Sequence, residues 1–93
     1  MIRSFADNAT ETLFCDGTSK RLPPEVVKRA LRKLDMVDSA HTVEDLRVPP
    51  GNRLHRLQGN RFGQYSLSIN DQWRLCFRFE GEDAFDVELC AYH

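Results

Sequence analysis

Residues 65–90 read YSLSINDQWRLCFRFEGEDAFDVELC, and the pattern of this stretch decides the fold. Apolar and polar residues alternate in three runs, at 65–70, 73–80 and 85–90. A period of two is typical of β-strands that bury one face. The two short segments between the runs carry Asn, Asp and Gly, which favour turns. The sequence therefore predicts three strands that pair as antiparallel neighbours.

The register of the last two strands follows from matching their apolar faces across the second turn. On the face away from the core, this register brings Arg74 close to Tyr92. A slip of one residue would bury charged side chains, which disfavours it. The predicted partners are Phe79 with Phe85, both facing the core, Arg78 with Asp86 as a charge pair, and Arg74 with Cys90.

Upstream of the strands, the apolar period changes from two to 3.6 residues. Between about Pro24 and Asp38, apolar residues recur at three- and four-residue spacing and form one stripe, while the basic residues fall outside it. This pattern predicts an amphipathic helix that begins at the Pro23-Pro24 pair and packs its apolar stripe on the sheet.

A shorter helix is predicted nearer the N-terminus. Asp7 or Asn8 is a suitable N-cap and Gly17 a suitable stop, with Ala9 and Leu13 facing inward. Further short elements are expected at 2–5 (an edge strand), 43–46 (a helical turn) and 53–57 (another strand).

Helices followed by a meander of strands indicate an α+β fold. We expect two or three N-terminal helices packed on a curved, mainly antiparallel sheet of four to five strands. A chain of 93 residues has material for one hydrophobic core, so residues 1–93 are expected to form a single domain.

The composition predicts a cytoplasmic protein. No run approaches the roughly 18 apolar residues of a membrane span, and the N-terminus lacks the apolar stretch of a signal peptide. The three cysteines lack the spacing of a zinc site or a disulfide framework. We therefore expect three buried thiols, no bound metal ion and no cofactor.

The charges are segregated along the chain, although the net charge is only −1. Residues 18–34 hold six basic residues and one acid, and residues 47–78 hold six arginines and one acid. Residues 79–93 hold five acids and neither Lys nor Arg. A near-neutral protein can therefore present a positive face, and arginine forks fit phosphate oxygens bidentately.

Histidine, arginine and tyrosine on a small sheet suit cleavage of RNA without a metal ion. His55 lies in an arginine-rich segment, and His93 follows Tyr92 at the end of a strand near Arg74. RNA carries its own nucleophile, the 2′-hydroxyl. The protein must supply a base, an acid for the leaving 5′-oxygen, and cations for the charge of the phosphorane. The first product would be a 2′,3′-cyclic phosphate.

Several segments together resemble the HigB group of the RelE/ParE superfamily, the toxins of bacterial type II toxin–antitoxin pairs. The resemblance covers nearly the whole chain, and the order and spacing of the segments make it more specific than any single one. The segments are MIRSF (1–5), DLRVPPGNRL (45–54), GQYS (63–66), NDQWRLCF (70–77) and the terminal YH (92–93).

The resemblance implies a toxin with an α+β fold that acts as an mRNA interferase. Such an endoribonuclease cuts mRNA mainly in the decoding site of the ribosome and works without a metal ion. The resemblance also implies inhibition by a HigA-type antitoxin that carries a helix-turn-helix. The complex of the two represses its own operon, so operator DNA is contacted only through that complex.

Matched residue by residue, the resemblance assigns the acid–base roles to His55 and His93, without deciding which of them is the base. Tyr92 is expected to stack on a base or to pass a proton, and Arg74 to stabilise phosphate charge. RNA contacts are also expected from Arg53, Arg56, Gln58 and Arg61 near His55, and contacts with ribosomal RNA from Arg29 and Arg32 in the helix of residues 24–38.

Two positions depart from the family pattern. Ala91 stands where the terminal motif usually has Asp, and Gln58 stands where some members have Lys. Loss of one acid–base group typically slows a reaction by about 10²–10⁴-fold. An attenuated toxin is therefore one interpretation of this chain.

Two alternatives follow from the same residues. A catalytically inactive binding module that acts as a co-repressor with its antitoxin is favoured by Ala91. A ParE-like toxin of DNA gyrase is disfavoured, because poisoning gyrase needs no acid–base pair such as His55 with Tyr92 and His93.

Overall fold

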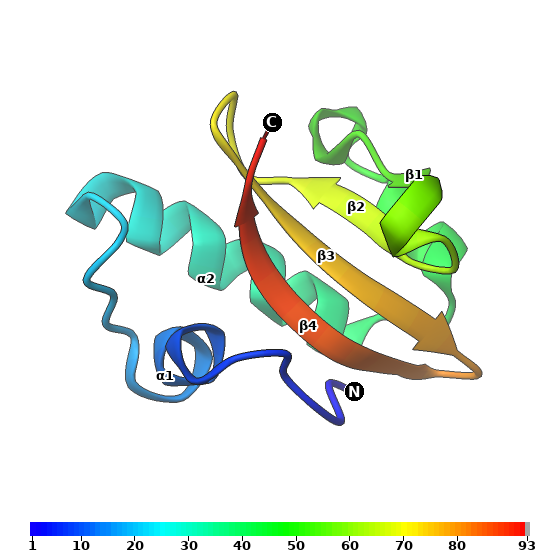
Figure 1. Cartoon of the computed structure of the whole chain (residues 1–93), viewed down its shortest axis with the longest axis horizontal. Helices are drawn as coiled ribbons and strands as arrows, with labels where there is room; N and C mark the ends of the chain where they lie inside the picture. The colour runs from blue at the N-terminus through cyan, green and yellow to red at the C-terminus, as the bar shows by residue number, and fades with distance from the viewer. Residues whose placement is uncertain (93) are drawn as a thin grey trace.

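Two α-helices pack against one face of a four-stranded antiparallel sheet in the computed structural model, which describes residues 1–92 (Figure 1). No helix in this part of the chain is long and apolar enough to cross a membrane. The predicted α+β class is confirmed. The elements are α1 (Asn8–Asp16), α2 (Pro24–Ser39), β1 (His55–Arg56), β2 (Tyr65–Ser68), β3 (Trp73–Glu80) and β4 (Asp83–Ala91), in the sheet order β1-β2-β3-β4, with 3₁₀ turns at Val43–Arg47, Pro50–Asn52 and Gly59–Arg61.

Local sequence explains where the two helices begin and end. The Asp7 carboxylate caps α1 by accepting a hydrogen bond from the backbone N–H of Thr10 at 2.8 Å. Gly17 ends α1 in the left-handed conformation, with φ at +72°. Pro24 lies in the first turn of α2, where its missing N–H costs nothing. The longer helix ends at Ser39, one residue beyond the predicted end.

The inward face of α1 differs from the prediction at two positions. Ala9 and Cys15 were expected to be buried, and both are exposed. The buried residues of α1 are Thr10 and Leu13, and a helix turns about 100° per residue, which carries Cys15 about 200° around from Leu13. Thr10 faces inward because its Oγ1 accepts a hydrogen bond from the backbone N–H of Leu89 at 2.9 Å, which ties α1 to β4.

The core lies between the helices and the sheet. The side chains of Leu13, Leu34, Val37, Leu67, Leu75, Phe77 and Val87 are all fully buried there. They come from both helices and from β2, β3 and β4, so one core holds the described chain together.

The hairpin of β3 and β4 departs from the predicted register near its turn. Glu80 pairs with Asp83 across a two-residue turn led by Gly81, whose φ is +64°. This tight turn shifts the nearby partners by one residue, and a bulge opposite Phe77, where Asp86 has φ at +55°, absorbs the shift. Beyond the bulge the predicted partners hold, including Arg74 with Cys90.

The predicted pairing of Phe79 with Phe85 is therefore wrong. Phe79 pairs with Ala84, which takes the core position and is fully buried, and Arg78 pairs with Phe85. Phe85 lies outside the core. Its ring centroid is 5.2 Å from the guanidinium carbon of Arg78. The Arg78–Asp86 charge pair still forms, with Nε 3.0 Å from Oδ2.

Both edges of the sheet are shorter than predicted. The N-terminal segment runs parallel to β4 as isolated bridges at Ile2 and Phe5 and covers that edge. At the other edge, the strand predicted at 53–57 is reduced to β1. Arg53 has a left-handed backbone with φ at +47°, so extended pairing with β2 begins only at His55.

Candidate active site

The face of the sheet turned away from the helices, called here the outer face, carries four of the predicted site residues: His55, Arg61, Arg74 and Tyr92. The register aligns His55 of β1, Ser66 of β2, Cys76 of β3 and Glu88 of β4 in one row across the sheet. Arg74 lies two residues from Cys76 and therefore projects from the same face. The fold thus brings residues from four strands onto one surface.

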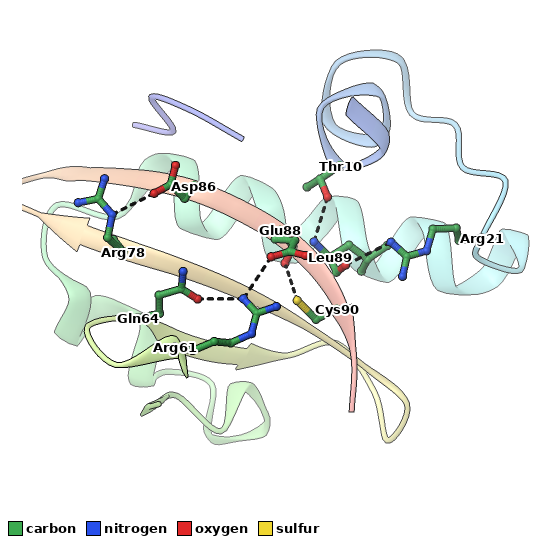
Figure 2. Close-up of polar contacts among 9 residues, drawn as sticks. All are labelled: Thr10, Arg21, Arg61, Gln64, Arg78, Asp86, Glu88, Leu89 and Cys90. Atoms are coloured by element: carbon green, nitrogen blue, oxygen red, sulfur yellow. Dashed lines mark hydrogen bonds and ion pairs between the residues drawn. The ribbon is translucent and has the colours of Figure 1, made fainter. Parts of the chain in front are cut away.

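Arg61 reaches the outer face from the loop between β1 and β2 (Figure 2). Its Nη1 donates to Gln64 Oε1 at 3.0 Å and to Glu88 Oε1 at 3.1 Å. The hydrogen bond with Glu88 raises the pKa of the Arg61 guanidinium. About a third of each side chain of the ion pair is exposed. Arg61 is therefore a fixed cation that a phosphate can still approach.

Arg74 and Tyr92 lie together on this face, as the predicted register requires. The guanidinium carbon of Arg74 is 5.2 Å from the centroid of the Tyr92 ring. The backbone N–H of Tyr92 donates to the carbonyl of Gln72 at 2.9 Å, which fixes the chain where it leaves β4. Within residues 1–92, Arg74 has no ion-pair partner and its buried Nε has no hydrogen-bond partner. Its positive charge is thus not neutralised by a carboxylate in that part of the chain.

His55 is exposed on the edge strand, two strands away from Arg74. Its Nδ1 lies 2.9 Å from the carbonyl oxygen of Arg53. A carbonyl only accepts hydrogen bonds, so Nδ1 carries the proton in this contact and Nε2 has a lone pair in the neutral ring. This tautomer suits a general base whose Nε2 accepts a proton.

Two buried thiols lie in the same region of the outer face. A hydrogen bond from Cys90, together with the charges of Arg74 and Arg61, lowers the pKa of the Cys76 thiol. The same hydrogen bond and burial raise the pKa of the Cys90 thiol. The charges of Arg74 and Arg61 favour the thiolate form of Cys76, and the charge of Glu88 opposes it.

The other predicted RNA-binding residues lie outside this surface. Arg56 and Gln58 are exposed at the edge of the sheet, and the Arg56 guanidinium lies 5.6 Å from the centroid of the Tyr65 ring. Arg29 and Arg32 are exposed on α2, beyond the opposite face of the sheet, and line a shallow groove there together with Pro24, Glu25 and Lys28. The predicted RNA-binding residues therefore lie in three places: the outer face, the β1 edge of the sheet and α2.

The end of the chain is only partly described. Ala91 closes β4 opposite Trp73 and lines a groove together with Asp71, Gln72 and Tyr92. Its pairing with Trp73 places it on the face opposite to Arg74. The predicted roles of His93 fall on a residue outside the described part of the chain.

Sequence reasoning missed Glu88. The strand alternation places this carboxylate on the outer face, and that signal was available. Its partner, however, comes from a loop 27 residues away, and no periodic pattern relates the two positions. The pairing of Arg61 with Glu88 therefore needed the structure.

Comparison with known proteins identifies the class first. Residues 3–93 match the family described as the RelE-like toxin of the type II toxin–antitoxin system HigB, so the chain is a RelE-like toxin by class. A chain of the YoeB–YefM complex from Staphylococcus aureus has the same fold, with a TM-score of 0.62 at 19% identity, over 100% of this chain and 98% of that chain.

The curated relatives identify the family. The chain is 41% identical over 90 residues to Toxin HigB-1 of Vibrio cholerae, which covers 96% of this chain and 95% of the relative. It is 31% identical over 93 residues to Endoribonuclease HigB of Proteus vulgaris, over the full length of both. The chain belongs to the HigB-like toxins of type II toxin–antitoxin systems, and the resemblance found in the sequence is confirmed.

Proposed function

We propose that this toxin is a ribosome-dependent mRNA endonuclease that cleaves RNA by acid–base catalysis with its own side chains. One observation carries the proposal: the outer face presents His55, Arg61, Arg74 and Tyr92 together. The name of the relative Endoribonuclease HigB supports RNA cleavage as the reaction.

In the proposed reaction, a base removes the proton of a 2′-hydroxyl and the 2′-oxygen attacks the adjacent phosphorus. The 5′-oxygen of the next nucleotide leaves and takes a proton from an acid. The upstream fragment then ends in a 2′,3′-cyclic phosphate and the downstream fragment begins with a 5′-hydroxyl. His55 is one acid–base candidate and His93 the other, while Arg74 and Arg61 stabilise the charge of the phosphorane.

The exposed basic surface of α2 supports docking on ribosomal RNA. Lys28, Arg29 and Arg32 line one groove with a single acid, Glu25. Burial lowers the pKa of the neighbouring Lys33, and the charges of Arg29 and Arg32 act in the same direction. Such a surface binds the phosphate backbone without reading sequence.

The partner expected for a toxin of this family is an antitoxin. We propose a HigA-type antitoxin with a helix-turn-helix, so that the toxin reaches operator DNA only within their complex. The similar chain of the YoeB–YefM complex supports an antitoxin partner in general. The protein would act in the cytoplasm, where ribosomes and mRNA are.

The test measures cleavage of mRNA on programmed ribosomes. A parallel reaction contains the same mRNA free in solution. We expect cleavage only on the ribosome, and a rate at least about 10²-fold lower for His55→Ala and for Arg74→Ala. Arg47→Ala is the control, because Arg47 pairs with Glu44 outside the outer face. Variants that cut as fast as the parent would contradict the site.

A second candidate is a co-repressor that binds its antitoxin but does not cut RNA. The alanine at position 91 favours it, because the family pattern has a carboxylate there. In that case the parent chain leaves ribosome-bound mRNA intact and still forms a stable complex with the antitoxin.

A further inference from the structure

Phe62 is unusually exposed for an aromatic residue. Among residues 1–92, three large apolar side chains are mostly exposed, and Phe62, at 80%, exceeds Val48 at 74% and Met1 at 54%. A phenylalanine buries about 150–250 Å² when it packs, so this ring forgoes a large apolar contact. A single exposed apolar side chain is common. The loop and the pocket around Phe62 distinguish it from the other two.

The loop that carries Phe62 is held in a defined conformation. The backbone N–H of Phe62 donates to the carbonyl of Gly59 at 3.1 Å, and the backbone N–H of Gln64 donates to the carbonyl of Arg61 at 2.9 Å. The Arg61 side chain binds Gln64 within the loop and Glu88 on β4. Gly63, with φ at +95°, allows the sharp return into β2. The ring is therefore presented to solvent by an anchored turn.

Phe62 borders a pocket of about 250 Å³ at the β1 edge of the sheet. This volume is below the roughly 300–1,000 Å³ of sites for drug-sized ligands and suits one planar ring. The pocket offers three aromatic rings, two side-chain amides and one guanidinium: Phe62, Tyr65 and Phe79, Gln58 and Gln64, and Arg56. None of its lining residues is acidic.

We propose that this pocket takes one base of a single-stranded RNA, stacked on Phe62. The amides of Gln58 and Gln64 would meet the polar edge of the base, and the Arg56 guanidinium a neighbouring phosphate. Bases stack on aromatic rings in this way throughout single-strand recognition, and the absence of an acid from the pocket lining suits a polyanion.

The position of the pocket agrees with the proposed function, on which this inference rests. Arg56 directly follows His55, and consecutive strand residues point to opposite faces. An RNA strand that crosses the short edge strand β1 would present its scissile phosphate to the outer face and a neighbouring base to the pocket. Phe62 would then be a binding residue that influences which sequences are cut.

The test measures binding without cleavage. A single-stranded oligonucleotide with 2′-O-methyl on every ribose cannot be cut, and a 2-aminopurine within it loses fluorescence when it stacks. At low salt, Phe62→Ala is expected to bind about tenfold more weakly and to lose the quenching. Phe62→Trp should retain both, because tryptophan keeps a stacking surface. Val48→Ala, another exposed apolar side chain, is the matched control and should behave as the parent.

Two results would overturn the inference. One is a Phe62→Ala protein that binds and quenches like the parent, and the other is a parent chain that does not quench 2-aminopurine at any position of the oligonucleotide. Failure of the proposed function looks different, because the parent would then quench the probe yet leave ribosome-bound mRNA uncut. Thermal unfolding of each variant shows that the fold is intact, as expected for changes at exposed side chains.

Discussion

At the scale of the residue, Glu88 partly neutralises the cation that Arg61 places on the outer face. Glu88→Gln removes the negative charge and leaves an oxygen that Arg61 can still bind. We predict that RNA binds several-fold more tightly, most clearly at low salt, because a repulsive charge near the phosphate is lost. Filter binding of an uncleavable RNA measures the effect. Glu11→Gln changes the net charge equally at an exposed residue of α1, and an equal gain there would contradict the local explanation.

The alanine at position 91 gives the second prediction at this scale. Ala91→Asp would restore the carboxylate of the family pattern next to Tyr92, on the face of the sheet opposite to Arg74, so we expect it to orient the end of the chain and not to act as the base on the outer face. We predict initial cleavage rates on programmed ribosomes about 10²-fold above the parent. Ala91→Asn has the same shape without the charge. If Asn raises the rate as much as Asp, the charge of the carboxylate has no role.

Some contacts between single residues could be predicted from the sequence, and others could not. Alternation placed Arg74 and Tyr92 on one face, because strands have a strict period of two and the register beyond the bulge was correct. The contact of Arg61 with Glu88 depends on the path of a loop, which follows no period. The shared face of Arg74 and Tyr92 was therefore predictable, and the Arg61–Glu88 ion pair was not.

At the scale of the element, one buried hydroxyl links α1 to β4. Thr10 is fully buried, and its Oγ1 accepts from the backbone N–H of Leu89. Thr10→Val keeps the shape but leaves that N–H unpaired, which should lower the free energy of unfolding by about 1–3 kcal/mol. Thr10→Ser keeps the acceptor and should lose less. Urea unfolding measures both, and equal losses would contradict a role for the hydrogen bond.

The basic surface of α2 gives a prediction about docking. Charge reversal at Arg29 and Arg32 to Glu should weaken ribosome binding by more than tenfold at low salt and by less at high salt, because each change removes a phosphate contact. Co-sedimentation with ribosomes measures it. Arg47→Glu reverses a charge outside this surface and should have a small effect. Binding that does not change in the double variant would remove α2 from the docking surface.

The elements themselves were largely predictable, and the departures have local causes. The long helix, the three main strands and the α1 caps follow from periodicity and from Asp7 and Gly17. The bulge near Asp86 was missed, because the tight turn at Gly81 and the core positions of β4 require different registers. The sequence pattern alone does not indicate where the extra residue is absorbed.

At the scale of the whole molecule, two groups of arginines lie on opposite sides of the sheet. The outer face carries Arg61 and Arg74, and α2 with Arg29 and Arg32 lies across the core (Figure 1). One phosphate cannot contact both surfaces. Docking and chemistry are therefore expected to be separable, so that α2 variants lose ribosome binding while the outer-face variants lose the rate of cleavage.

In the proposed reaction the RNA 2′-hydroxyl is the nucleophile, and the acid and the base come from this chain. The most direct measurement is the chemical nature of the new ends after cleavage of ribosome-bound mRNA. We expect a 2′,3′-cyclic phosphate on the upstream fragment and a 5′-hydroxyl on the downstream fragment, and neither product from His55→Ala. A 3′-hydroxyl with a 5′-phosphate would contradict the proposed reaction, because water and not the ribose would then have attacked the phosphorus.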